Sequence, residues 1–235
     1  MSNLPTFIQK SLALTVHIFT ASGLLAAFMS ILAIQEKNWP AAMLWLLVCL
    51  LIDGIDGTFA RLFRVKEVLP EIDGKTIDYV VDFATYAIIP AYFFHESEIV
   101  SSEWKLPLTF LILLVSALYY GKEGMVSTDN YFIGFPVLWN MVVFYLLFAV
   151  NFSTLINAIL IIFFAVLHFI PVKFAYPSRA SRLKIPTLLV SIIFLTAVPL
   201  TVLYYPTPPI WLIGILHLTL VYYAGLAIWD TFFDN

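Results

Sequence analysis

The stretch LLIDGIDGTFARLF, at residues 50–63, ends a long apolar run with two aspartates and an arginine. The next apolar run opens with GKTIDYVVDFATY, at 74–86, and carries two more aspartates. A charged side chain at bilayer depth costs roughly 2.5 kcal/mol or more, so it is seldom kept without a function. The two stretches therefore indicate a membrane fold with a polar site between neighbouring helices.

The composition of the whole chain agrees with a membrane fold, because 62% of its residues are hydrophobic and only 11% are charged. An apolar run of about 20 residues crosses a bilayer core as a helix. We therefore predict a single all-α transmembrane domain over residues 1–235, which contains the four aspartates of the 53–82 stretch. The eight predicted transmembrane helices cover approximately 11–35, 40–63, 74–95, 104–120, 132–150, 153–172, 185–204 and 209–229.

Lysine and arginine predict the orientation of these helices, because short loops rich in them stay on the cytoplasmic side. With eight helices and a cytoplasmic N-terminus, only Lys37 and Lys105 of the 12 basic residues fall outside. Both termini and the loop between the two aspartate-bearing helices are therefore predicted to be cytoplasmic.

The four aspartates lie on consistent helix faces. Asp53 and Asp56 share one stripe of the second helix with Gly57, Ala60 and Arg61, because the five are spaced i, i+3, i+4, i+7 and i+8. On the third helix a matching stripe repeats every four residues, at Gly74, Asp78 and Asp82.

Four carboxylates in one pocket repel one another unless a positive charge lies between them. One guanidinium, that of Arg61, cannot neutralise four acids, so we favour divalent cations over simple ion pairing. Neither stripe contains cysteine or histidine, and oxygen ligands suit Mg²⁺ or Mn²⁺. We predict a site for two such ions, with four candidate ligands: Asp53, Asp56, Asp78 and Asp82.

The combined pattern, Asp-x2-Asp-Gly-x2-Ala-Arg followed by Gly-x3-Asp-x3-Asp, resembles the signature of the CDP-alcohol phosphotransferase family. The resemblance implies a core of six transmembrane helices, often dimeric, with a cavity open to the cytoplasm, and it implies Asp82 as the catalytic base. Two of the eight predicted helices lie beyond that core. The 62–73 segment is longer than in many members, so we expect a longer loop over the cavity.

Four further segments, at 16–23, 65–70, 129–140 and 171–179, resemble a bacterial branch of this family that uses choline. This similarity implies transfer of a phosphatidyl group from CDP-diacylglycerol to choline, with release of CMP and with Mn²⁺ or a similar ion, in the bacterial inner membrane. Membrane lipids are expected partners and nucleic acids are not. Serine or glycerol 3-phosphate as the acceptor stays open, and a transporter is a remote alternative.

Several residues are candidates for binding CDP-diacylglycerol, each with a plainer alternative. Small residues let a ligand, or simply another helix, approach the backbone. A guanidinium can pair with a diphosphate or orient an aspartate, and basic residues near 173–184 can also face lipid headgroups. Polar side chains of the first helix could line a cytidine pocket or bond to a neighbouring helix. The candidates are Gly57, Ala60, Arg61, Gly74, His17, Thr20 and Arg179.

A quaternary ammonium cannot donate a hydrogen bond, so a choline pocket should offer aromatic faces. Aromatic residues are 17% of the chain, and many are expected to face lipid instead. His168 and His217 have no ligand partners at useful spacing, so we expect them to pack or to bond locally. The candidates for choline binding are Tyr79, Tyr86, Tyr131, Phe135, Trp139 and Asn140.

Overall fold

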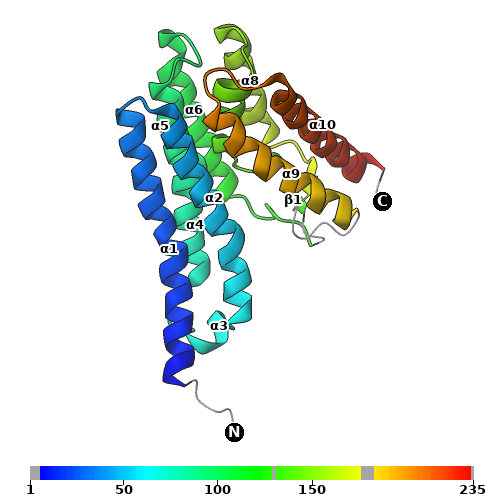
Figure 1. Cartoon of the computed structure of the whole chain (residues 1–235). Helices are drawn as coiled ribbons and strands as arrows, with labels where there is room; N and C mark the ends of the chain where they lie inside the picture. Colours follow the sequence, from blue (N-terminus) through cyan, green and yellow to red (C-terminus); the bar gives the residue numbers. More distant parts are fainter. Residues whose placement is uncertain (1–5, 129–130, 176–182, 234–235) are drawn as a thin grey trace. The chain divides into compact units, whose positions relative to one another are not determined.

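The computed structural model describes residues 6–128, 131–175 and 183–233. The chain divides into two compact units, residues 1–90 and 91–235. Nearly all of the regular structure of these residues is helical, which confirms the predicted all-α class, and a short pair of β-strands is an exception (Figure 1).

Local capping signals set where the helices of the first unit begin. A capping box between Thr6 and Gln9 starts the first helix, and the Asn38 side chain accepts a hydrogen bond from Ala41 N at the start of the second. Asp73 caps the fourth, and a hydrogen bond from the Thr76 hydroxyl holds the pKa of Asp73 below its usual value. The helices are α1 (Phe7–Gln35), α2 (Trp39–Leu62), α3 (Val65–Val68) and α4 (Gly74–Asp82), followed by the π-helical turn η1 (Phe83–Ile88).

Small residues allow α1 to approach its neighbours closely. The Ser30 hydroxyl donates to the Ala42 carbonyl at 2.9 Å, and the Cys49 thiol lies 3.5 Å from the Gly23 carbonyl. A Cβ atom added to Gly23 would lie 2.8 Å from Val81 Cγ1, so this glycine lets α1 and α4 meet. Such contacts are typical of helices packed in a membrane.

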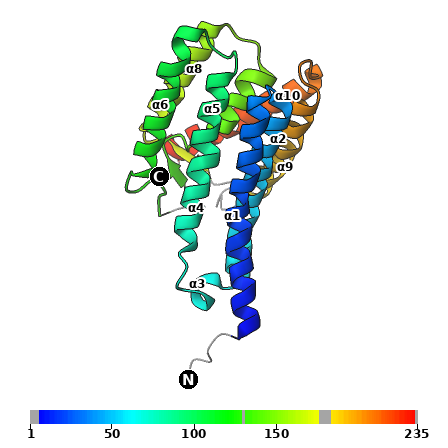
Figure 2. The same cartoon turned by 90° about the vertical axis from the view of Figure 1, so that its left-hand side faces the viewer.

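The predicted long loop at 62–73 contains α3 rather than only irregular chain. Val65 and Val68 are buried against Ala13 and Val16 of α1, with Phe59 of α2 at the edge of the cluster. Figure 2 shows α3 at the end of the unit where α1 and α4 begin. Apolar packing therefore fixes this segment on the first helix.

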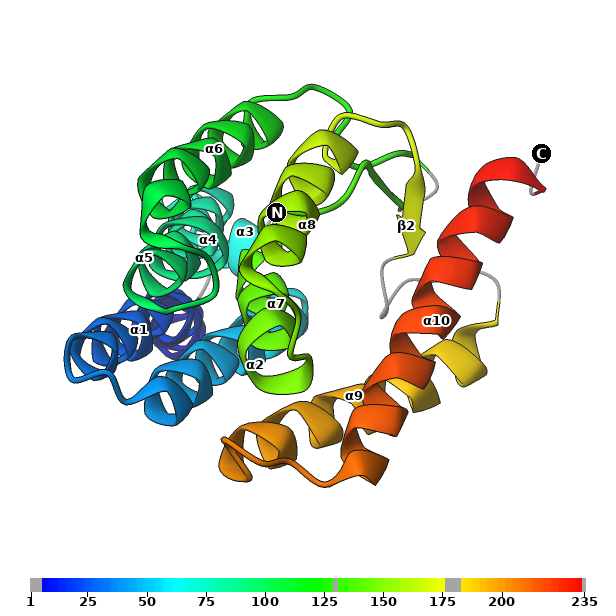
Figure 3. The same ribbon diagram turned by 90° about the horizontal axis from the view of Figure 1, so that it is seen from above.

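In the second unit, α5 (Ile89–Glu96) extends the helix that begins at Gly74, and the helices then form neighbouring pairs. Figure 3 shows α9 beside α10, and α8 beside α6, consistent with their contacts. β1 pairs antiparallel with β2, with Tyr131 opposite Ala175. The remaining elements are α6 (Ser102–Tyr120), β1 (Tyr131–Ile133), α7 (Trp139–Phe144), η2 (Tyr145–Ala149), α8 (Thr154–Leu167), β2 (Lys173–Ala175), α9 (Lys184–Leu203) and α10 (Ile210–Phe232).

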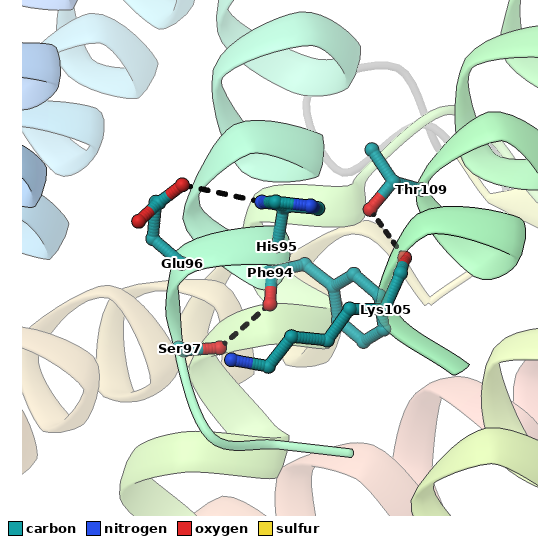
Figure 4. Close-up of polar contacts among 6 residues, drawn as sticks. All are labelled: Phe94, His95, Glu96, Ser97, Lys105 and Thr109. Carbon is teal, nitrogen blue, oxygen red and sulfur yellow. Dashed lines mark hydrogen bonds and ion pairs between the residues drawn. The ribbon is translucent and has the colours of Figure 1, made fainter. Parts of the chain in front are cut away.

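Local hydrogen bonds close the helix that ends at Glu96. The Ser97 hydroxyl donates to the Phe94 carbonyl at 2.9 Å, and His95 Nδ1 lies 3.2 Å from a Glu96 carboxylate oxygen (Figure 4). In α6, the Thr109 hydroxyl donates to the Lys105 carbonyl at 2.7 Å. These bonds satisfy polar groups near the turn that joins the two helices.

Within the described residues, six helices are long and apolar enough to cross a membrane. They correspond to six of the eight predicted spans, and the chain is an integral membrane protein. The other two predictions, 132–150 and 153–172, correspond to shorter apolar helices, Trp139–Ala149 and Thr154–Leu167.

Gly134 explains why the first of these two helices starts late. Its φ is +90°, and a Cβ atom there would lie 2.0 Å from the His168 carbonyl oxygen. The chain around Gly134 is therefore extended and packed against the end of α8, with β1 directly before it. A pattern of apolar residues alone does not reveal this long-range contact.

Candidate metal and substrate site

Three of the four predicted carboxylates come together in the first unit. Asp53 of α2 and Asp78 and Asp82 of α4 each offer an oxygen atom, and these atoms all lie within 4.8 Å of one another. All three residues are partly buried. The sequence prediction that two acidic stripes face each other therefore holds for these three side chains.

Asp56, the fourth predicted ligand, does not belong to this group of three. It is 6% exposed, and its carboxylate interacts with the side chain of Thr20 on α1. The Thr20 hydroxyl also lies 3.3 Å from the Val16 carbonyl. Asp56 thus shares the acidic face of α2, while its side-chain partner Thr20 comes from another helix.

The carboxyl groups of Asp53 and Asp82 interact with each other directly. Tyr86 donates its hydroxyl to Asp53 Oδ2 at 2.6 Å. Asp82 Oδ1 is buried and has no hydrogen-bond partner among the described residues. Acceptors therefore outnumber donors at this site.

Such a site suits a hard divalent cation. Two carboxylates in contact require a proton or a cation between them, and a third carboxylate lies within reach. Among the described residues, no ion pair links these aspartates to lysine or arginine. The three aspartates present only oxygen, which is the ligand type that Mg²⁺ and Mn²⁺ prefer, so the cluster can bind such an ion.

The candidate residues for CDP-diacylglycerol lie in several local environments. Gly74 faces His17, because a Cβ atom at Gly74 would lie 2.8 Å from His17 Cε1. His17 is 6% exposed and its Nε2 has no hydrogen-bond partner among the described residues. Gly74 thus makes room for the His17 imidazole of α1, so its small size is explained by helix packing and not only by a ligand. The Nε2 atom of that imidazole stays available to a ligand.

The other candidates of α2 also have protein neighbours. Gly57 faces Arg61, whose Nη1 would lie 3.4 Å from an added Cβ atom. The Arg61 guanidinium donates to Thr58 Oγ1 at 3.2 Å, and Ala60 packs at the edge of the α3 cluster. Arg179 lies outside the described residues.

The two candidates for choline binding in the first unit, Tyr79 and Tyr86, make different contacts: Tyr79 through its ring and Tyr86 through its hydroxyl. Tyr79 is 38% exposed, and the Lys75 ammonium lies 5.2 Å from the centre of its ring. Tyr86 is buried with its hydroxyl on Asp53. The sequence pattern indicated only the ring of Tyr86 and not this hydrogen bond, because the π-helical turn after Asp82 breaks the usual helical spacing.

In the second unit, Phe135 and Trp139 belong to one aromatic cluster around His168. Trp139 is fully buried, stacks on His168 with ring centres 5.3 Å apart, and donates its Nε1–H to Ser116. Phe135 packs on the Phe164 ring at 4.7 Å. The imidazole thus covers an aromatic face that was predicted for choline.

Tyr131 and Asn140, the last two choline candidates, have partners within the protein, and so do His168 and His217. The Lys173 ammonium lies 5.3 Å from the Tyr131 ring centre, and Asn140 Oδ1 accepts a hydrogen bond from Met141 N. His168 Nδ1 and His217 Nδ1 each contact a carbonyl one turn earlier in the chain, at 2.7 Å. The local role predicted for both histidines is confirmed.

Helices long and apolar enough to cross a membrane, and an acidic cluster that could bind a cation, define the class of this chain, an integral membrane protein with a carboxylate-lined site. Comparison with known proteins then supplies the family. The chain is 37% identical over 213 residues to a phosphatidylcholine synthase of Rhizobium meliloti, covering 90% of this chain and 88% of the relative.

Two further relatives carry the same name. One, from Pseudomonas aeruginosa, is 34% identical over 224 residues, which is 95% of this chain and 94% of the relative. The other, from Borreliella burgdorferi, is 40% identical over 187 residues and 79% of each chain. No protein-family model matches the chain. The chain belongs to the phosphatidylcholine synthase family.

Proposed function

We propose that this protein transfers the phosphatidyl group of CDP-diacylglycerol to choline and releases CMP. The convergence of Asp53, Asp78 and Asp82, on helices long and apolar enough to cross a membrane, is the observation that carries the proposal, because a diphosphate substrate brings negative charge that such a cation site can balance. The name shared by the relatives supports choline as the acceptor.

The site is proposed to hold two divalent ions, Mn²⁺ or Mg²⁺, with Asp53, Asp78 and Asp82 as ligands and with Asp56 as the fourth. When bound, the ions neutralise charge on the diphosphate without any transfer of protons. The contact between Asp53 and Asp82, and the absence of a paired cationic side chain in the described cluster, support this assignment.

Asp82 is the proposed general base. The choline oxygen attacks the phosphorus that bears the diacylglycerol, the bond from that phosphorus to the CMP oxygen breaks, and the hydroxyl proton passes to Asp82. The products are phosphatidylcholine and CMP. Asp82 Oδ1 supports the role, because it is buried and has no hydrogen-bond partner among the described residues.

The substrate contacts follow from the chemistry of each group. His17, with a free Nε2, and Thr20, which reaches Asp56, are proposed for the cytidine side. Arg61 and Arg179 are proposed for the phosphates, beside the small residues Gly57, Ala60 and Gly74. For the ammonium group we propose aromatic contacts drawn from Tyr79, Tyr86, Tyr131, Phe135 and Trp139, with Asn140 nearby in sequence.

An acceptor panel tests the reaction. Purified protein is given CDP-diacylglycerol and Mn²⁺ with choline, serine, ethanolamine, inositol or glycerol 3-phosphate, and CMP is measured. We expect choline to give the highest rate and to yield phosphatidylcholine. A higher rate with serine or glycerol 3-phosphate would replace choline as the acceptor, and no release of CMP with any alcohol would contradict the transferase itself.

We further propose that residues 1–235 form one catalytic domain. The assembly that we propose is a homodimer in the bacterial inner membrane. Both termini and the site face the cytoplasm in this proposal. Cysteine probes at Lys66 and Ser101, in a Cys49→Ala background, should react from the cytoplasmic and the opposite side, respectively. The reverse labelling would contradict the orientation.

A further inference from the structure

The π-helical turn η1, at Phe83–Ile88, begins directly after Asp82 in the middle of a membrane-spanning helix. Turns of this kind are rare, appear mostly as single turns inside α-helices, and are frequent at functional sites. A π-helical turn holds more residues than an α-helical turn, so it changes the direction in which the following side chains point. Tyr86 lies within it.

Tyr86 is 5% exposed, and its hydroxyl donates to Asp53 Oδ2 at 2.6 Å across to α2. This length is typical of a short, strong hydrogen bond to a charged acceptor. The bond joins residues 33 positions apart in the sequence. It therefore fixes the orientation of one carboxylate of the acidic cluster from the neighbouring helix.

Carboxylates that bind a metal are commonly held by outer hydrogen bonds, whose loss weakens metal binding about 10–100-fold. At Asp53, one oxygen accepts the Tyr86 hydroxyl, and the carboxyl group also contacts Asp82. Without the hydroxyl, the Asp53 side chain would be free to rotate away from the other two acids. The tyrosine thus acts on the geometry of the cluster through Asp53.

We propose that Tyr86 is a positioning residue that holds Asp53 in the orientation required of a metal ligand. This inference rests on the cation site of the proposed function. It differs from the role of Tyr86 as an aromatic contact for choline, because it assigns the hydroxyl rather than the ring.

The test compares Tyr86→Phe with Tyr119→Phe in purified full-length protein. Tyr119 is a matched control, because it is 1% exposed and its hydroxyl has no hydrogen-bond partner among the described residues. Binding of Mn²⁺ alone is measured by electron paramagnetic resonance. We expect Tyr86→Phe to weaken Mn²⁺ binding about 10–100-fold, and Tyr119→Phe to leave it unchanged. Raised Mn²⁺ should restore turnover by Tyr86→Phe.

Asp53→Asn and the double variant Asp53→Asn/Tyr86→Phe separate the two proposals. Once Asp53 is changed, loss of the Tyr86 hydroxyl should weaken Mn²⁺ binding no further. If Asp53→Asn weakens Mn²⁺ binding but Tyr86→Phe does not, the positioning role is wrong while the metal site stands. A raised KM for choline with unchanged Mn²⁺ binding in Tyr86→Phe would likewise overturn it, because the hydroxyl would then act on choline and not through Asp53. If the unaltered protein binds no Mn²⁺, the metal site and the positioning role both fail.

Discussion

The hydroxyl pairs of α9 and α10 and the acidic cluster of α2 and α4 are both polar side chains on apolar helices. The hydrogen-bonding groups of the two sets are satisfied in different ways. In the second unit, the Thr187 and Tyr222 hydroxyls lie 2.8 Å apart, and those of Ser191 and Tyr223 lie 2.6 Å apart. Ser191 also donates to the Thr187 carbonyl, so it can accept from Tyr223. Donors and acceptors are matched within these two hydroxyl pairs.

In the first unit, the acidic cluster has three carboxylates. The Tyr86 hydroxyl donates a hydrogen bond to one of them, that of Asp53. Matched hydroxyl pairs hold helices together and need nothing from outside. An excess of acceptors requires a proton or a cation from outside. The difference teaches which polar groups in a membrane helix are structural and which form a ligand site.

Removal of metal should have the largest effect, because the acidic cluster depends on a cation and the hydroxyl pairs of α9 and α10 do not. Prolonged dialysis against chelator is expected to abolish CMP release, because the clustered acids lose the cation that balances them and the diphosphate. Added Mn²⁺ or Mg²⁺ should restore it. Full activity in excess chelator would contradict the metal-dependent site.

Asp82→Asn should reduce turnover roughly 10²–10⁴-fold, the usual contribution of a general base. The amide keeps the size of the side chain but cannot take the choline proton. CDP-diacylglycerol should still bind in the presence of metal, as measured by ligand binding to the purified variant. A near-normal rate with choline would show that another group accepts the proton.

Asp53→Asn should produce a smaller and different defect, because it removes a metal ligand rather than the base. We expect weaker binding of metal and nucleotide, with partial recovery of the rate as Mn²⁺ is raised. A titration of rate against Mn²⁺ measures this, with Asp82→Asn for comparison. Asp82→Asn lacks the proposed base as well as a proposed ligand, so raised Mn²⁺ should not restore its rate. Equal behaviour of the two variants would contradict their separate roles.

Ser191→Ala should have the smallest effect. Loss of the bond to Tyr223 is expected to lower stability by about 0.6 kcal/mol, a typical value for hydrogen bonds between membrane helices, and to leave Mn²⁺ binding unchanged. Thr196→Ala is a matched control on α9, because Thr196 is exposed and its hydroxyl bonds to the Ile192 carbonyl of its own helix. Weaker Mn²⁺ binding by Ser191→Ala would break the distinction between structural and ligand-binding polar groups.

The sequence by itself determined the membrane class, six of the spans, and the acidic faces of α2 and α4. These features depend on composition and on the 3.6-residue period of a helix, both of which are local. The same period placed all four aspartates on these two faces. Only the tertiary structure decided that Asp53, Asp78 and Asp82 converge while Asp56 interacts with Thr20 of α1.

The tertiary structure also decided the partners of several aromatic residues. The π-helical turn shifts Tyr86 onto Asp53, His168 covers one face of Trp139, and Gly134 packs against the end of α8. Each contact joins residues distant in the sequence or follows a break in helical period. Local patterns give the face on which a side chain lies, but packing between elements selects the group that it meets.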